Sequence, residues 1–193
     1  MDDPGSVALT FDDGPHPAGT PAILERLAQA HAHATFFLVG EQVERWPALA
    51  REIAAVGHTI GVHAYRHHTL PRLGPRRLGA DLSRAVAAIH EATGVVPRHA
   101  RPPRGLFTAG DLLLARRYGW ELVSWSRWGR DWEARATPDS VARLAAHDLR
   151  GGEIILLHDA DHYAAPDSWQ RTAAALPEIL RALSERGLTP APL

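Results

Sequence analysis

Cysteine and lysine are both absent from this chain of 193 residues. The first absence excludes disulfide bonds, thiolate metal sites and cysteine nucleophiles. The second excludes Schiff-base chemistry and lysine-bound pyridoxal phosphate, because all 21 of the lysine-plus-arginine residues are arginine. A metal site in this protein would have to use histidine and carboxylate ligands, and the chain contains 12 histidines.

A strong net charge, a long apolar run and a glycine-rich phosphate motif are missing as well. The formal net charge of −1 gives no electrostatic argument for nucleic acid or an anionic membrane surface as partner. No apolar run approaches the length of a membrane span, and residues 1–6 lack the pattern of a signal peptide. We expect a monomeric, cytoplasmic protein; a secreted protein whose leader had been removed would have the same sequence.

Short apolar runs alternate with helical patterns along the whole chain, which indicates one α/β domain over residues 1–193 with a mainly parallel sheet, open or closed into a barrel. Strands are predicted over residues 7–11, 34–39, 59–63, 99–102, 121–125, 153–158 and 188–193. Helices are predicted over residues 21–30, 43–56, 76–93, 109–118, 139–148 and 169–186. Helix ends carry the expected signals: Thr108 and Thr137 as N-caps, and Gly57, Gly94, Gly119 and Gly187 just after helical patterns.

The first predicted strand ends in two adjacent carboxylates, Asp12 and Asp13, followed by the turn signal Gly14-Pro15. An unpaired buried charge is strongly disfavoured, so a cation, a metal ion or a proton is expected beside this pair. Taken alone, such a motif is more often a turn with an Asx hydrogen bond. The ends of the other strands therefore decide between the two interpretations.

Titratable side chains also follow the other predicted strands. His63 and His67 are four residues apart, so both rings can face one cation in a helical turn or a tight loop. Arg101, Asp131 and His158 follow later strands. Folds of this type place their chemistry at the carboxyl ends of the strands. One aspartate and two histidines would leave a coordination position free for water, as hydrolytic metal sites do.

These segments, in this order, resemble the motifs of the polysaccharide deacetylases, the NodB-homology domain of carbohydrate esterase family 4. They read TFDDGP at 10–15, HAYRH at 63–67, RPPRG at 101–105, WSRWGRDW at 125–132 and ILLHD at 155–159. The resemblance covers essentially the whole chain. It implies a distorted, partly open (β/α) barrel and a hydrolase that removes N-acetyl groups from amino sugars with one divalent metal ion. Zinc is the expected ion, and cobalt or nickel could replace it.

The resemblance also implies roles for individual residues. Asp12 would be the general base, with Arg101 pairing with it and orienting it. His158 would be the general acid, and Asp131 would tune it. Three residues would bind the metal ion: Asp13, His63 and His67.

Further residues are expected to contact the substrate. The resemblance implies that Trp132 and Leu156 form the apolar walls around the acetyl methyl group, and that the backbone N–H of Arg104 helps to stabilise the oxyanion. A polar loop directly follows His158, and loops on an active face often carry specificity. Three residues of this loop are predicted to contact substrate: Asp161, His162 and Tyr163.

Three positions depart from the family pattern. Ala64 stands where a serine or threonine hydroxyl usually supports the second histidine, which would weaken metal binding unless another group compensates. Arg104 replaces a common tyrosine, and Trp128 replaces a smaller or acidic residue. None of these changes touches the implied base, acid or metal ligands. We therefore expect an active enzyme, but its substrate preference cannot be inferred from that of its relatives.

Two alternatives stay open at this point. A hydrolase of the same fold could cleave a non-sugar C–N bond in a small metabolite. A carbohydrate-binding domain with a degenerate, non-catalytic site is the other alternative. The intact set of base, acid and metal ligands argues against the second alternative, because binding alone does not require all of them together.

Overall fold

The computed structural model describes residues 3–67 and 74–193. Within these residues the strands are β1 (Ser6–Asp12), β2 (Thr35–Leu38), β3 (Thr59–Val62), β4 (His99–Ala100), β5 (Glu121–Leu122), β6 (Arg127–Trp128), β7 (Ile154–His158) and β8 (Thr189–Ala191). The helices are α1 (Gly19–Gln29), α2 (Gly40–Arg45), α3 (Pro47–Ala55), α4 (Pro75–Thr93), α5 (Ala109–Tyr118), α6 (Pro138–Ala146) and α7 (Ser168–Glu185), with a 3-10 turn, η2, at Pro103–Gly105.

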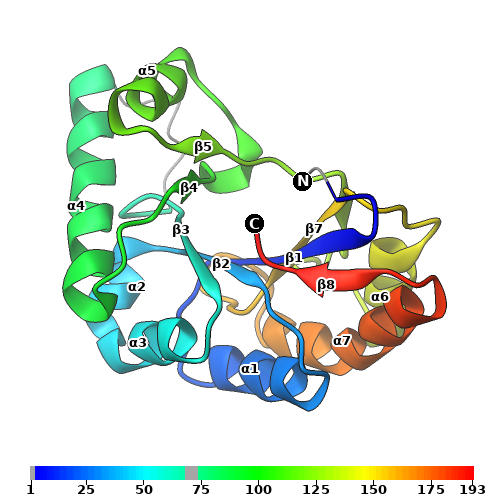
Figure 1. The fold of residues 1–193 in the computed structure, drawn as a ribbon. Coiled ribbons are helices and arrows are strands. Elements are labelled where there is room, and N and C mark those ends of the chain that lie inside the picture. Colours follow the sequence, from blue (N-terminus) through cyan, green and yellow to red (C-terminus); the bar gives the residue numbers. More distant parts are fainter. Residues whose placement is uncertain (1–2, 68–73) are drawn as a thin grey trace.

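The strands form one curved, parallel sheet with the helices on its outside (Figure 1). The strand order is β5-β4-β3-β2-β1-β7-β6, and β8 pairs with the first residues of β1. The two edge strands, β5 and β6, belong to one stretch of chain and are separated by residues 123–126 alone. The ring is therefore closed by this short covalent link, because β5 and β6 are not paired with each other in the described chain. The expected partly open barrel is confirmed.

Strand β1 lies between β2 and β7 in the sheet and is buried along its whole length. Val7, Leu9 and Phe11 belong to the main hydrophobic cluster, together with apolar residues of the surrounding helices. Successive side chains of a strand point to opposite faces, so Thr10 and Asp12 point into the barrel. The alternation of β1 thus delivers one carboxylate to the interior at the end of the strand.

The helix ends agree with most of the sequence signals. Thr108 and Thr137 each cap a helix through a reciprocal capping box. All four predicted C-terminal glycines have a positive φ. The predicted helix over 43–56 is wrong in one respect, because Trp46 separates α2 from α3 and Pro47 starts the second helix. Proline lacks the N–H that would continue the first helix.

The link between the sheet edges also differs from the prediction. The strand predicted over 121–125 ends at Leu122, and β6 was not predicted at all. Both strands have only two residues, too few to show the alternation by which a strand is identified in sequence. None of the helices in the described part of the chain combines the length and the apolar content that crossing a membrane requires.

Candidate metal and catalytic site

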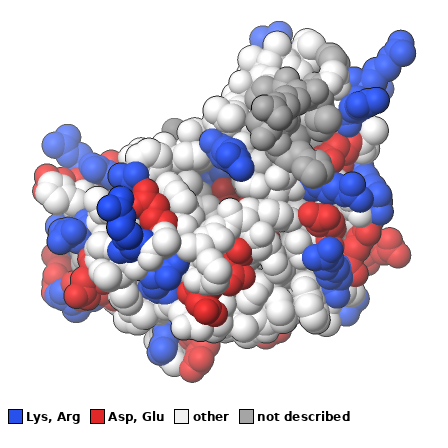
Figure 2. All heavy atoms as spheres, turned by 180° about the vertical axis from the view of Figure 1, so that it is seen from behind, with Lys and Arg blue, Asp and Glu red and all other residues white. Residues whose placement is uncertain are grey.

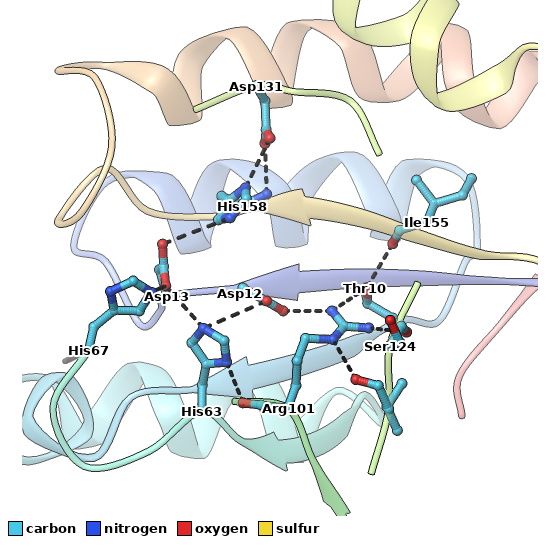
Figure 3. Close-up of polar contacts among 11 residues, drawn as sticks. Thr10, Asp12, Asp13, His63, His67, Arg101, Ser124, Asp131, Ile155 and His158 are labelled. Carbon is cyan, nitrogen blue, oxygen red and sulfur yellow. Dashed lines mark hydrogen bonds and ion pairs between the residues drawn. The ribbon is translucent and has the colours of Figure 1, made fainter. Parts of the chain in front are cut away.

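Strand register brings the predicted site residues to one end of the barrel. In the pairing of β1 with β7, Asp12 lies opposite His158. In the pairing of β3 with β4, Val62 lies opposite Ala100, so the next residues, His63 and Arg101, are neighbours as well. The parallel sheet therefore gathers residues that are distant in sequence at the carboxyl ends of its strands (Figure 3).

Asp13, His63 and His67 converge on a single point. The Oδ1 atom of Asp13 lies 3.5 Å from the Nε2 atom of His63 and 3.5 Å from the Nε2 atom of His67 (Figure 3). The Nδ1 atom of His63 lies 2.7 Å from the carbonyl oxygen of Arg101. A carbonyl only accepts, so this nitrogen carries the proton and the Nε2 lone pair faces Asp13. Three possible ligand atoms are thus aimed at one position.

The charges at this point fit a cation. Burial lowers the pKa of His63 and lowers that of His67 to about 3, so both rings are neutral at pH 7, as metal ligation requires. Burial raises the pKa of Asp13 to about 7. Its Oδ1 atom is buried and has no hydrogen-bond partner among the described residues. A bound divalent ion would both satisfy this oxygen and offset the cost of burying its charge.

Asp12 is held by a buried arginine. The Nη1 atom of Arg101 donates to Asp12 Oδ1 at 2.8 Å and to Thr10 Oγ1 at 2.8 Å. The other guanidinium nitrogens donate to the carbonyl oxygens of Val123 and Ser124. Every nitrogen of the guanidinium donates at least one hydrogen bond, which holds the group in place. The hydrogen bond from Arg101 fixes the direction of the Asp12 carboxylate.

His158 and Asp131 form a second buried pair. Asp131 accepts one hydrogen bond from the backbone N–H of His158 at 2.7 Å and lies 2.9 Å from its Nδ1 atom (Figure 3). Burial alone would lower the pKa of His158, but the charge of Asp131 and this hydrogen bond raise it to about 10. The imidazole is therefore protonated in the neutral range, with its Nε2 atom 4.0 Å from Asp13 Oδ2.

These two pairs and the three converging ligands open into one cleft of about 330 Å³. Three tryptophans form one of its walls: the ring centroids of Trp125 and Trp128 are 6.3 Å apart, and those of Trp128 and Trp132 are 5.9 Å apart. Trp132 also packs edge to face against His158, and Leu156 lines the same cleft. Arg104 lies at its edge in a left-handed conformation with φ of 60°. On the face shown in Figure 2, arginine and acidic side chains are interspersed and neither sign forms a continuous patch.

The loop after β7 divides its three predicted residues between two places. Tyr163 lines the cleft. Asp161 lies 3.3 Å from the Nε2 atom of His16, and the ring of His162 packs 4.9 Å from that of His16. The Nδ1 atom of His16 accepts a hydrogen bond from the N–H of Gly19 at 2.8 Å, so its Nε2 atom carries the proton and faces Asp161. This second cluster therefore braces two loops, and its protonated Nε2 is unsuited to bind a metal ion.

Several supporting residues were not predicted. Thr172 of α7 donates to Oδ2 of Asp131 at 2.7 Å, the same oxygen that accepts from the backbone N–H of His158. Asp159 is buried beneath the turn after Asp13, accepts a hydrogen bond from Thr20 and has a pKa raised to about 7 by burial. A Cβ atom on Gly14 would lie 2.3 Å from its carboxylate, which explains the glycine there. For Asp159 the signal was its place directly after His158; Thr172 has no signal in the sequence.

Comparison with known proteins gives consistent results. A sequence profile described as polysaccharide deacetylase matches residues 2–123. The chain is 37% identical over 195 residues to a chitooligosaccharide deacetylase of Bradyrhizobium sp. (strain ANU 289), covering 97% of this chain and 89% of that protein. It is 33% identical over 183 residues to a peptidoglycan-N-acetylglucosamine deacetylase of Bacillus cereus, covering 94% and 83% of the two chains. A family 4 carbohydrate esterase from Streptomyces lividans, solved in complex with acetate, superposes with a TM-score of 0.87 at 32% identity, covering 97% and 92%.

Proposed function

The chain belongs to the polysaccharide deacetylase family, and from this membership we propose that it is a divalent-metal-dependent N-deacetylase of N-acetylated amino sugars. The substrate would be a chitin- or peptidoglycan-type oligosaccharide or a small amino-sugar conjugate. The observation that carries the proposal is the convergence, in one cleft, of a carboxylate paired with arginine, an imidazole paired with carboxylate and three possible metal-ligand atoms that lie close together. Hydrolysis of an amide requires a base, an acid and an electrophile together.

The metal-binding residues in this proposal are Asp13, His63 and His67, with zinc as the expected ion and cobalt or nickel as substitutes. When bound, such an ion would polarise the acetamide carbonyl and lower the pKa of the attacking water. The single hydrogen bond from His63 to the Arg101 carbonyl keeps one ring in the tautomer that ligation needs.

Asp12 and His158 would move the protons. Asp12 accepts the proton of the attacking water, while the hydrogen bond from Arg101 keeps its carboxylate aimed at the cleft. A new C–O bond forms at the carbonyl carbon. The C–N bond then breaks as His158 delivers its proton to the amine nitrogen, which is a poor leaving group until it is protonated. The products are acetate and the free amino sugar. For the next cycle Asp12 releases its proton to solvent, and His158, whose protonated form Asp131 favours, takes up a proton from solvent.

The remaining cleft residues would hold the acetyl group. Trp132 and Leu156 form an apolar surface beside His158, suited to a methyl group. The backbone N–H of Arg104 is proposed as a donor to the oxyanion, since the left-handed conformation of this residue sets the direction of its peptide groups at the edge of the cleft. The exposed ring of Trp128, next to Trp132, is suited to stacking on a sugar.

An acetate-release assay tests the proposal. Purified protein would be stripped with a chelator, reloaded with Zn²⁺, Co²⁺ or Ni²⁺, and given chitin oligomers, an N-acetylated monosaccharide and small N-acetyl compounds without a sugar. We expect release from the sugars by reloaded protein and none by stripped protein. Release from the non-sugar amides alone would favour the small-metabolite hydrolase. Binding of oligomers with no release from any substrate would favour a binding domain and overturn the proposal.

A further inference from the structure

His67 packs against two neighbouring rings. Its centroid lies 4.3 Å from that of Tyr163 with the planes only 11° apart, and 5.4 Å from that of His63 with the planes 40° apart. A nearly parallel ring at van der Waals distance prevents the imidazole from tilting, because its face is already covered. His63 is oriented differently, by its hydrogen bond to the Arg101 carbonyl. Among the described residues, the contact that fixes the ring plane of His67 is the stacked Tyr163.

Tyr163 is itself anchored at its far end. Its hydroxyl donates to Oε1 of Glu41 at 2.8 Å and accepts from Nε2 of Gln42 at 3.0 Å. Both partners belong to the first turn of α2, more than 120 positions earlier in the chain, and Gln42 is buried. A phenol that is stacked on one side and hydrogen-bonded at its tip has little rotational freedom.

The same turn of α2 holds the backbone between the two histidines. The N–H of Gly40 donates to the carbonyl of Ala64 at 3.0 Å, and the N–H of Glu41 donates to that of Tyr65 at 2.9 Å. A Cβ atom on Gly40 would lie 2.7 Å from the ring of Tyr65, so the two segments are in direct contact. The side chain of Ala64 is a methyl group and offers no hydrogen bond to either histidine. Support for His67 has to come from elsewhere.

We propose that Tyr163 is a positioning residue for the metal ligand His67, with its ring setting the plane of the imidazole and Glu41 and Gln42 fixing the ring. This inference rests on the proposed metal site. It gives the loop after β7 a second role beside substrate contact, because the residue that faces the cleft also holds a ligand. It also explains how the site tolerates an alanine at position 64.

Metal affinity measured by chelator competition tests the proposal without relying on turnover. Loss of an outer support of a metal ligand typically reduces affinity about 10-fold or more. We expect about that loss of Zn²⁺ affinity in Tyr163→Leu, which removes both the ring and the hydroxyl. Tyr163→Phe keeps the ring, so its Zn²⁺ affinity should fall only about threefold, less than in Tyr163→Leu. The visible spectrum of the Co²⁺-loaded protein should change in Tyr163→Leu, since the geometry around the ion is altered.

Two controls make the test specific. Tyr118→Leu makes the same chemical change on the surface of α5, remote from the cleft, and should leave Zn²⁺ affinity and the Co²⁺ spectrum unchanged. Glu41→Ala removes one of the two hydrogen bonds that Tyr163→Phe removes, so the double variant should lose no more affinity than Tyr163→Phe alone.

Two results would overturn the inference in distinguishable ways. If Tyr163→Leu binds Zn²⁺ as tightly as wild type, with an unchanged Co²⁺ spectrum and a raised KM only, then Tyr163 contacts substrate and does not hold His67. If the wild-type protein itself binds no divalent ion, the proposed function fails first, and the positioning role of Tyr163 fails with it.

Discussion

The two sides of the cleft are held by different means. On the strand side, Asp12 and His158 end paired strands, while Asp13, His63 and Arg101 directly follow strands, so backbone ladders set their relative positions. On the loop side, residues 159–167 connect β7 with α7 and are held by side-chain contacts, such as Tyr163 with Glu41 and Asp161 with His16. One side is fixed by the sheet, and the other by a few side-chain pairs with helix α2 and with the loop that contains His16.

This difference predicts which side of the cleft carries the catalytic residues and which side can vary in sequence. A base, an acid and metal ligands must stay within tenths of an ångström of their working positions, which a buried parallel sheet can guarantee. A loop held by partly exposed pairs can change its residues with little effect on the sheet. Substitutions on the strand side should therefore mainly lower kcat, and substitutions on the loop side should mainly change the affinity for substrate or metal ion.

The largest effect is expected for Asp12→Asn, which tests the strand side directly. The amide can still accept a hydrogen bond from Arg101 but cannot take a proton, so kcat for acetate release should fall by about 10³-fold. The zinc content should be nearly unchanged, as measured by metal analysis of the purified protein. The comparison variant His63→Ala should instead lower zinc content. An Asp12→Asn protein with the wild-type rate would show that the base is another residue.

The next largest effect is a shift in pH dependence in Asp131→Asn. Proton donation requires protonated His158, and Asp131 raises the pKa of this imidazole to about 10. Without the carboxylate, burial lowers that pKa, so the protonated form is lost at lower pH. The alkaline limb of the kcat/KM profile should shift to lower pH by more than one unit. At pH 8 the value of kcat/KM should therefore fall about 10-fold or more. A profile with an unmoved alkaline limb would remove Asp131 from the role of tuning His158.

A smaller effect is expected for Trp128→Ala on the tryptophan wall. Its ring is 44% exposed at the cleft and packs against Trp125 and Trp132, so it can stack on a sugar without moving. Aromatic packing of this kind contributes about 0.5–1.5 kcal/mol, which corresponds to a roughly 2- to 10-fold rise in KM for chitin oligomers. kcat should change little. Initial rates over a range of oligomer concentrations check this, and a drop in kcat alone would contradict a role in binding.

The smallest effect is expected for Asp161→Ala on the loop side. Its carboxylate oxygens already interact with His16 and with the N–H of Asp167, which limits what they offer to a substrate. The variant should change KM by about twofold and lower the free energy of unfolding by about 0.5–1 kcal/mol, measured by urea denaturation. A KM raised 10-fold at unchanged stability would support the predicted substrate contact and weaken the contrast between the two sides.

The strand side was predictable from sequence for a physical reason. Each of Asp12, His63 and His158 stands at or just after the carboxyl end of an apolar run, and parallel pairing brings such ends together. The backbone acceptors of Arg101 at Val123 and Ser124 were not predictable, because they depend on how the chain bends between two strands of two residues each. Periodicity carries no information over so short a stretch.

The loop side was predictable only as a location. The position of the loop after β7 indicated that it borders the site, and Tyr163 does line the cleft. Which loop residues turn inward depends on partners far away in the chain, such as Glu41 for Tyr163 and His16 for Asp161. No local pattern around 161–163 identifies those partners. The break between α2 and α3 was missed for a related reason, because the apolar pattern continues across Trp46 and hides the interruption.

The short link between β5 and β6 has a consequence for how such a chain can change over time. Its residue count sets the circumference of the ring, since the same stretch must reach from one sheet edge to the other. An inserted residue would reverse which side chains point inward and withdraw the oxygens that hold the Arg101 guanidinium. The outer loops can accept insertions, but an insertion here would disturb the position of Arg101 and, through it, of Asp12. The side chains of this stretch can vary, but its number of residues is constrained by the closure of the barrel.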